Sequence, residues 1–197
     1  MKFKSVVTGL ALAALAIGPA KAGDTANRFA VEGPGLLACS DFIEARADKT
    51  SLEYQRFIGF VEGYLSAANR YEPNTFDLSP WHNAVAFDLI INNHCSENPA
   101  DPVVAVLQKM VSALRPIRIA QFSKMVEVGA GENKAVVYEA ILRRAQAELR
   151  NRGLYSGEET GQFSPELREA LFAYQKRSNL FETGVPDPAT LWTLLNP

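Results

Sequence analysis

Four short helix-start signals constrain the fold of this chain most strongly. Each is a Ser or Asp followed by Pro, and the residues after it include apolar side chains recurring every three or four positions. A short polar side chain at the N-cap accepts a free backbone N–H, and proline suits the first helical position, where an N–H is not needed. The signals are Ser79-Pro80, Asp101-Pro102, Ser164-Pro165 and Asp187-Pro188. Because we find no convincing strand alternation, the sequence predicts an all-α fold.

The N-terminus predicts export. Lys2 and Lys4 form a positive start, residues 6–17 are almost entirely apolar, and Ala20-Lys21-Ala22 has the small residues of a cleavage site. This pattern is typical of a secretory signal peptide, here residues 1–22. The alternative is a membrane anchor, but the apolar run has 12 residues, and roughly 20 are needed to span a bilayer. We therefore expect a soluble mature chain with no membrane span.

The charge and composition of the mature chain exclude some classes of protein. Loss of the three lysines in residues 1–22 leaves 17 basic and 22 acidic side chains, and this acidic balance disfavours a nucleic-acid partner. A hydrophobic content of 47% excludes a chain that is disordered throughout. Basic residues gather in segment 116–152, including Arg143, Arg144, Arg150 and Arg152. They form either a solvated helix face or a patch that meets an anionic wall polymer or a partner.

Four helices are expected in the first part of the mature chain. The predicted stretches are 36–47, from Thr50 to about 68, 80–93 and 102–115. Thr50-Ser51-Leu52-Glu53 has the capping-box form, in which a hydroxyl and a carboxylate satisfy the first backbone N–H groups. The side chains predicted to face inward include Leu37, Phe42, Ile43, Tyr54, Phe57, Ile58, Val61, Leu65, Ala68, Trp81, Val85, Leu89, Ile90, Val103, Val106, Leu107, Met110 and Leu114. Residues 117–128 are predicted as a further amphipathic helix, and Gly129-Ala130-Gly131 as a flexible domain boundary.

The chain has two cysteines, Cys39 and Cys95. An even number of cysteines in an exported protein favours a disulfide, and closing a loop of this length stabilises a fold by about 4 kcal/mol in the chain-entropy model. A metal site and free thiols are the alternatives. His82 and His94 lie nearby in the sequence, but no CxxC or HxxxH spacing supports a metal site.

Short motifs around the cysteines resemble a known fold. Cys39-Ser40-Asp41-Phe42 precedes a predicted helix, and Cys95-x-x-Asn98-Pro99 opens another. Together they resemble the HdeA-like fold, a group that includes periplasmic acid-stress chaperones. The segment from Gly59 to Leu65 is similar to the related helical bundle of type VI immunity proteins. The resemblance implies a disulfide-stapled four-helix bundle over residues 23–116, a helical linker over 117–131, and a periplasmic location.

The helical pattern is sharpest after Gly131. A helix is predicted over residues 133–152, ended by Gly153, since glycine often follows a helix in left-handed geometry. A turn-rich loop, a helix from Pro165, a stop at Asn179, a turn at Gly184 and a last helix from Pro188 follow. The succession Leu142, Gln146, Leu149, Gly153, Tyr155, Gly157, Gly161, Ala170, Tyr174, Gln175, Leu180, Thr183, Gly184, Asp187, Thr190 and Leu194 resembles the peptidoglycan-binding module of wall hydrolases, the PG-binding family.

That resemblance implies a three-helix bundle over residues 132–197 with peptidoglycan as its ligand. The sequence departs from the family pattern in one loop and at two helix ends: Thr160 replaces an acid, Ser164 and Leu167 stand for Gly and Thr, and Asn179 replaces a glycine. These departures put in doubt whether the loop over residues 156–164 binds as it does in the family.

Six residues are candidate peptidoglycan contacts: Arg143, Gln146, Tyr155, Gly161, Tyr174 and Gln175. Glutamine amides offer paired donors and acceptors, tyrosine rings pack against sugar faces, and an arginine such as Arg143 or Arg150 pairs a stem-peptide carboxylate. Each also has a structural interpretation. The glutamines can cap exposed backbone groups, and Tyr155 can belong to the core.

We expect no enzymatic activity, no cofactor and no metal. Zinc peptidases need several His and acidic ligands, and this chain has two histidines in one short region. No G-x-S-x-G motif occurs. A Cys–His transpeptidase needs a reactive thiol, whereas both cysteines are predicted to be bridged. A lytic glycosidase needs only one or two carboxylates, for which Glu53, Glu62 and Asp88 are candidates, but nothing pairs them.

The sequence thus predicts an exported, non-catalytic protein of the cell envelope. It would bind peptidoglycan through its C-terminal module and present its helical N-terminal part to an envelope protein. An HdeA-like periplasmic chaperone, and an inhibitor or immunity-type protein against a wall-degrading enzyme, are the alternatives.

Overall fold

The computed structural model describes residues 24–26 and 28–196, so the predicted signal peptide over residues 1–22 lies outside the described residues. The chain divides into two units at Glu32. The helices and strands of the described residues all lie in the second unit, from Glu32 onward. Within the part of the chain that the structure describes, none of the helices has the length and apolar character of a membrane span.

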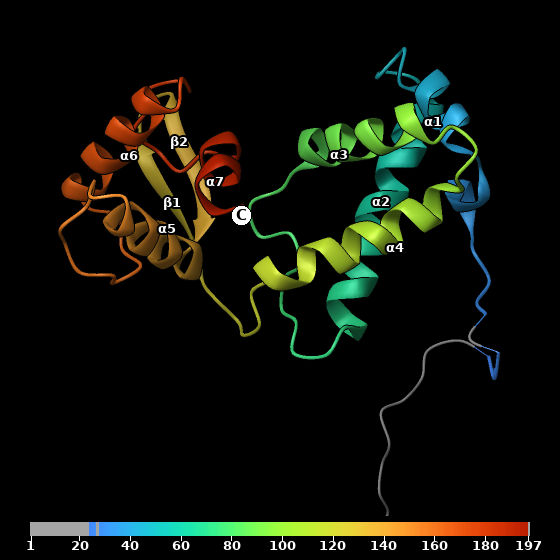
Figure 1. Ribbon diagram of the computed structural model, residues 1–197, viewed down its shortest axis with the longest axis horizontal. Coiled ribbons are helices and arrows are strands. Elements are labelled where there is room, and N and C mark those ends of the chain that lie inside the picture. The colour runs from blue at the N-terminus through green and yellow to red at the C-terminus, as the bar shows by residue number, and fades with distance from the viewer. Residues whose placement is uncertain (1–23, 27, 197) are drawn as a thin grey trace, which may run out of the picture. The chain divides into compact units, whose positions relative to one another are not determined.

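The first half of the second unit is helical (Figure 1). Its α-helices are α1 (Cys39–Ala45), α2 (Leu52–Tyr71), α3 (Ala84–Glu97) and α4 (Val103–Leu114), with 3-10 turns η1 (Gly33–Leu36) and η2 (Arg115–Ile117). Each α-helix lies within or overlaps a predicted stretch. At α2, the residue that caps the helix is Ser51 rather than Thr50, because the Ser51 hydroxyl accepts from Tyr54 N.

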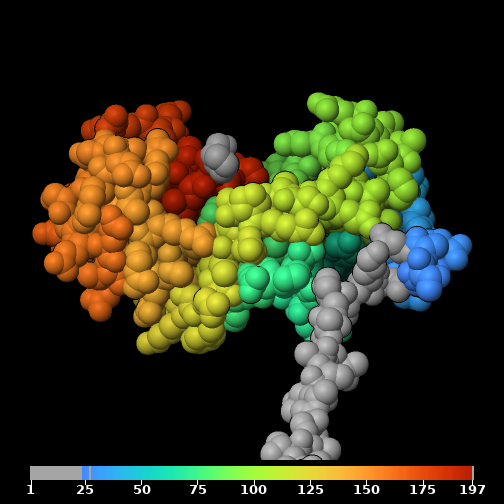
Figure 2. Space-filling model, turned by 60° about the horizontal axis from the view of Figure 1, so that its bottom comes forward, coloured from blue at the N-terminus to red at the C-terminus, as the bar shows by residue number. Residues whose placement is uncertain are grey.

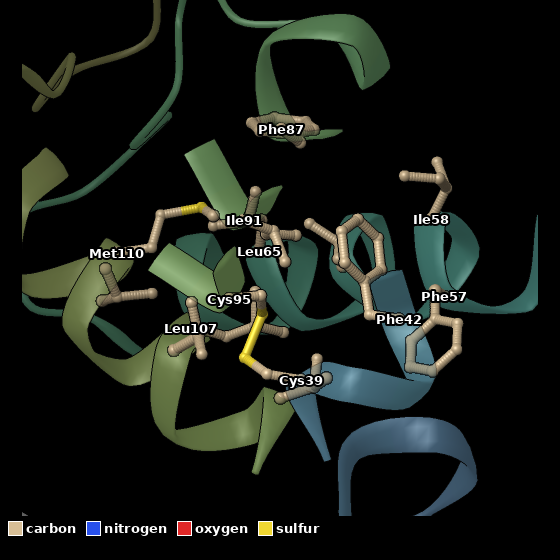
Figure 3. Close-up of a cluster of buried hydrophobic side chains, with 14 of the residues drawn as sticks. Cys39, Phe42, Phe57, Ile58, Leu65, Phe87, Ile91, Cys95, Leu107 and Met110 are labelled. Atoms are coloured by element: carbon tan, nitrogen blue, oxygen red, sulfur yellow. A yellow bond between two sulfur atoms is a disulfide. The ribbon is translucent and has the colours of Figure 1, made fainter. Parts of the chain in front are cut away.

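A disulfide between Cys39 and Cys95 confirms the predicted pairing and joins α1 to α3. Both cysteines are fully buried in a first core that α1 to α4 share (Figure 3). Phe42 packs edge-on against Phe57, with ring centroids 5.5 Å apart. The predicted stripe of α4 is buried as expected: Val103, Val106, Leu107, Met110 and Leu114. The bridge therefore lies inside the packed interior, where solvent does not reach it.

The inward faces of α1 and α3 differ from the prediction. Helix α3 begins at Ala84 with Asn83 as its N-cap, so Ser79-Pro80 forms a turn before the helix. Val85 and Leu89 are 63% and 49% exposed, whereas Phe87 and Ile91 are buried. The disulfide explains this face, because buried Cys95 places the residues four and eight positions earlier on the same side of the helix. Likewise α1 begins at Cys39, which leaves Leu37 outside the helix and 46% exposed.

The all-α prediction is wrong at one place, a β-hairpin. Strand β1 (Met125–Ala130) pairs antiparallel with β2 (Asn133–Tyr138). This hairpin replaces the end of the helix predicted over 117–128 and the start of the one predicted over 133–152. Val128 and Val137 turn inward and are buried, as the alternation of a half-buried strand requires. The preference of β-branched residues for strands explains why this segment pairs.

The glycines of residues 129–131 shape the hairpin turn instead of forming a flexible break. Gly129 has φ +97°, and a Cβ atom there would lie 2.1 Å from the carbonyl oxygen of Asn133. Gly131 has φ +59° and opens the two-residue connection between the strands. Only glycine adopts such geometry at little cost, so these residues fix the turn.

The hairpin and three helices surround a second core. The helices are α5 (Glu139–Asn151), α6 (Pro165–Arg177) and α7 (Pro188–Leu195). Residues 125–196 are called the C-terminal module below. Its buried side chains include Val128, Val137, Leu142, Leu149, Leu171 and Leu194. Trp81 and Ile119, which precede the module in the sequence, belong to the same core. The module is therefore completed by residues from the α2–α3 and α4–β1 connections.

Candidate functional site

Gln146 on α5 holds the loop that leads to α6. Its side chain is fully buried, its Oε1 accepts from Gly161 N at 2.7 Å, and its Nε2 donates to the carbonyl oxygen of Gln162 at 3.1 Å. The backbone N–H of Gly161 can only donate, which fixes the orientation of the amide. Gly161 has φ +76°, and a Cβ atom there would lie 2.7 Å from the carbonyl oxygen of Glu139. The loop thus approaches α5 more closely than a larger residue would permit.

Gln175 on α6 repeats this arrangement in the loop that leads to α7. The side chain is fully buried, Oε1 accepts from Gly184 N at 2.7 Å, and Nε2 donates to the carbonyl oxygen of Val185 at 2.9 Å. Gly184 also has positive φ, +68°. Nε2 donates in addition to Thr190 Oγ1 at 2.9 Å, and that hydroxyl donates to Asp187 Oδ2 at 2.8 Å. The nitrogen and the oxygen of the amide therefore both have hydrogen-bond partners inside the chain.

Both loops end in the same kind of helix cap, three residues after the glycine. Ser164 Oγ accepts from Leu167 N at 3.1 Å, and Asp187 Oδ1 accepts from Thr190 N at 2.9 Å. These are two of the four caps that the sequence predicts. The C-terminal module therefore uses one unit twice: a helix with a buried glutamine, a loop with a left-handed glycine, and a Ser/Asp-Pro helix start.

The basic side chains of α5 brace the same loop. Arg143 donates from Nε and Nη2 to the carbonyl oxygens of Glu159 and Thr160, each at 3.1 Å. Arg150 donates to the carbonyl oxygen of Gly157 and lies 3.0 Å from a carboxylate oxygen of Glu159. Figure 2 shows α5, this loop and α6, in shades of orange, gathered on one face of the molecule. Both arginines remain exposed, so their outer N–H groups stay accessible to an anion.

The other two arginines of the basic segment make internal contacts. Arg144 donates to the carbonyl oxygens of Ile117 and Arg118, and burial lowers the pKa of its guanidinium. Arg152 pairs with Glu148 at 2.9 Å and lies over the Tyr174 ring, 5.4 Å from its centroid. Arg144 and Arg152 thus make contacts that stabilise the module.

The structure places most of the six candidate contacts below the surface. Gln146, Gln175, Tyr155, Tyr174 and Gly161 are buried, and Arg143 is exposed. Tyr155 donates its hydroxyl to the carbonyl oxygen of Glu158 at 3.0 Å, and it packs in the second core. The glutamines bind backbone groups, as their structural interpretation anticipated. Direct contact between these six residues and a ligand stays a prediction.

Sequence reasoning missed a hollow between the hairpin turn and the α6–α7 loop. Its volume is about 610 Å³. The lining includes Asn133, Lys134, Asn179, Phe181, Thr183 and Asp187. The ring of Phe181 is 90% exposed, Lys134 and Asn179 are also exposed, and Thr183 and Asp187 belong to the hydrogen-bond network around Gln175. An apolar ring, amides, a hydroxyl and an ammonium group suit a ligand of sugars and short peptides.

The acidic side chains weighed as catalytic groups lie elsewhere. Asp88 is fully buried on α3, between Arg46 at 2.8 Å and Lys49 at 2.7 Å. Burial would raise the pKa of the Asp88 carboxyl, but hydrogen bonds from these two cations outweigh it, so the pKa is lowered. Glu53 and Glu62 are exposed on α2. Among residues 24–26 and 28–196, no three His, Cys, Asp or Glu side chains are grouped so that they could hold a metal ion.

Of the comparisons with known proteins, one found a match, and it lies in the C-terminal module. No curated protein sequence and no solved structure matches the chain. No comparison bears on the HdeA-like or immunity-type resemblance of the helical part, which stays a prediction. A family model described as "Putative peptidoglycan binding domain" matches residues 139–194, from the start of α5 into α7. The C-terminal part of this chain therefore carries a peptidoglycan-binding-like domain, as its residues predicted.

Proposed function

We propose that this chain is an exported, non-catalytic envelope protein that binds peptidoglycan through its C-terminal module. The observation that carries the proposal is the family match over residues 139–194. The buried disulfide is consistent with export, because such bonds persist in oxidising compartments. The wall contact would hold the helical part at high local concentration beside an envelope partner. Exposed Val85 and Leu89 on α3 suit such a protein contact.

We place the ligand in the hollow beside the α6–α7 loop. Phe181 can stack on a sugar face, because it is exposed and the buried network of Gln175 fixes the loop that carries it. Lys134 can pair with a stem-peptide carboxylate in exchange for its exposed ion pair with Glu127, now at 2.8 Å. Exposed ion pairs contribute little stability, so this exchange costs the fold little.

Co-sedimentation with purified peptidoglycan sacculi tests the proposal. The whole mature chain is needed, since Trp81 and Ile119 complete the second core. We expect Phe181→Ala to weaken binding about tenfold, the effect of losing one aromatic contact. Phe172→Ala is the matched control, because Phe172 is an exposed ring on α6 that does not line the hollow.

Two results would contradict the proposal at different levels. If Phe181→Ala and Phe172→Ala bind alike, the ligand lies outside this hollow. If the folded wild-type chain stays in the supernatant, the module does not bind the wall, and a protein-contact role such as inhibition of a wall-degrading enzyme gains support.

A further inference from the structure

His82 occupies an unusual position for an ionisable side chain. It lies just before α3, and both of its ring nitrogens are buried without a hydrogen-bond partner among the described residues. Nε1 of the neighbouring Trp81 is buried and unpartnered as well. An unpartnered buried polar group costs free energy, so this cluster is held together by the packing around it.

Three aromatic rings enclose His82. The ring of Phe87 on α3 is nearly parallel to the imidazole, with an interplanar angle of 2° and centroids 6.1 Å apart. Trp81 stacks at 5.6 Å, and Trp192 of α7 meets the imidazole edge-on at 5.1 Å. His82 therefore lies where the segment before α3 meets the last helix of the C-terminal module, and in its neutral form it packs as a flat apolar ring.

The charged groups around His82 do not compensate a positive charge. Burial lowers the pKa of His82 to about 4, although Asp77 and the backbone of Ser79, both in its own segment, act to raise it. On α3, the carboxylate of Asp88 is paired with Arg46 and Lys49. Helix α7 has no ionisable side chain, and its N-cap Asp187 accepts from Thr190. Contact with aromatic rings offsets only part of the cost of burying the imidazolium.

We propose that His82 is an acid-sensitive latch: protonation of its imidazole loosens the contact between α7 and the segment that precedes α3. A base whose pKa falls on burial favours the closed contact in its neutral form. The contact is therefore strongest above pH 6.5 and weakens as the pH falls from 6.5 towards 4. A difference of this size shifts the equilibrium between closed and open forms by up to about 300-fold. The inference does not depend on peptidoglycan binding.

Tryptophan fluorescence can follow the contact around His82. The chain has two tryptophans, and both contact His82, so intrinsic fluorescence reports on the cluster directly. In the whole mature protein we expect a reversible fluorescence change with a midpoint near pH 4, while far-UV circular dichroism stays constant. Imidazole NMR signals, from two histidines in all, should show His82 titrating at the same pH.

Two variants separate the latch from general acid effects. His82→Phe keeps a flat ring and should abolish the fluorescence change. His94→Gln should retain the fluorescence change, because His94 lies in the last turn of α3 and pairs there with Asp101 at 2.8 Å. A transition that persists in His82→Phe, or one accompanied by loss of helical signal, would overturn the proposal. If His82→Phe does not fold, titration of His82 near pH 6.5 in the wild-type NMR spectrum overturns it equally.

Discussion

Removal of the Cys39–Cys95 disulfide should cost much of the stability of the first core. The two cysteines are 56 positions apart, and constraining a loop of that size stabilises the folded state by about 4 kcal/mol in the chain-entropy model. Both side chains are fully buried, so Cys39→Ala/Cys95→Ala also removes packed sulfur atoms, at a further cost on the order of 1 kcal/mol. Against a typical total of about 5–15 kcal/mol, the double variant should be marginally stable.

Guanidinium denaturation at pH 7, followed by far-UV circular dichroism, measures this loss. Wild type with and without a reductant and the double variant should be compared in parallel. We expect the reductant to lower the midpoint of wild type and to leave that of the double variant unchanged. A loss below about 1 kcal/mol would refute the argument, because it would mean that the bridge scarcely restricts the unfolded chain.

Two further substitutions test buried polar groups. Gln175→Ala leaves the N–H of Gly184 without its acceptor and should lower stability by about 1–3 kcal/mol. Thermal melts measure this, and the control Gln108→Ala, at an exposed position on α4, should change stability by less than about 0.5 kcal/mol. Asp88→Asn should cost about 2 kcal/mol at pH 7, because it removes a charged hydrogen-bond partner of Arg46. The pKa of Asp88 is lowered from 3.8 in the folded chain, so this contribution is present above pH 4 and disappears as the pH falls below it. Urea denaturation at a series of pH values should show a weaker acid dependence for Asp88→Asn than for wild type, and identical slopes would contradict this account.

Of the four Ser/Asp-Pro signals, two cap a helix as predicted, whereas α3 is capped by Asn83 and α4 follows Pro102 without a side-chain cap. Ser164 and Asp187 cap α6 and α7 because the information for a cap lies within four residues. Local patterns failed where tertiary packing determines the secondary structure or the buried face of a helix. Val126 and Val128 fit both a helical and a strand pattern, and the second core selects the strand. The inward face of α3 depends on the disulfide at Cys95, a partner that the local pattern does not specify.

The sequence singled out residues that hold the loops of the module, and contact between any of them and a ligand stays a prediction. Gln146 and Gln175 were singled out, and both are central to the module, where they hold its loops. Phe181 was not singled out, because it lies in a loop without helical spacing. Its 90% exposure follows from the path of that loop, which the hydrogen bonds of Gln175 determine. Such exposure is visible only once the chain has been folded.

The repeated unit of a buried glutamine and a left-handed glycine has a consequence for how the C-terminal module tolerates insertions. Gln146 and its glycine are 15 positions apart, whereas Gln175 and its glycine are 9 positions apart. In both units, however, the glutamine Oε1 accepts from the glycine N at 2.7 Å. These hydrogen bonds therefore determine where a loop ends without determining how long it is. Added loop length costs little closing entropy. Residues 157–160 are not free to change in this way, because Arg143, Arg150 and Tyr155 bind their carbonyl groups. Exposed Ser156, just before them, is the natural place to insert an epitope or a randomised peptide.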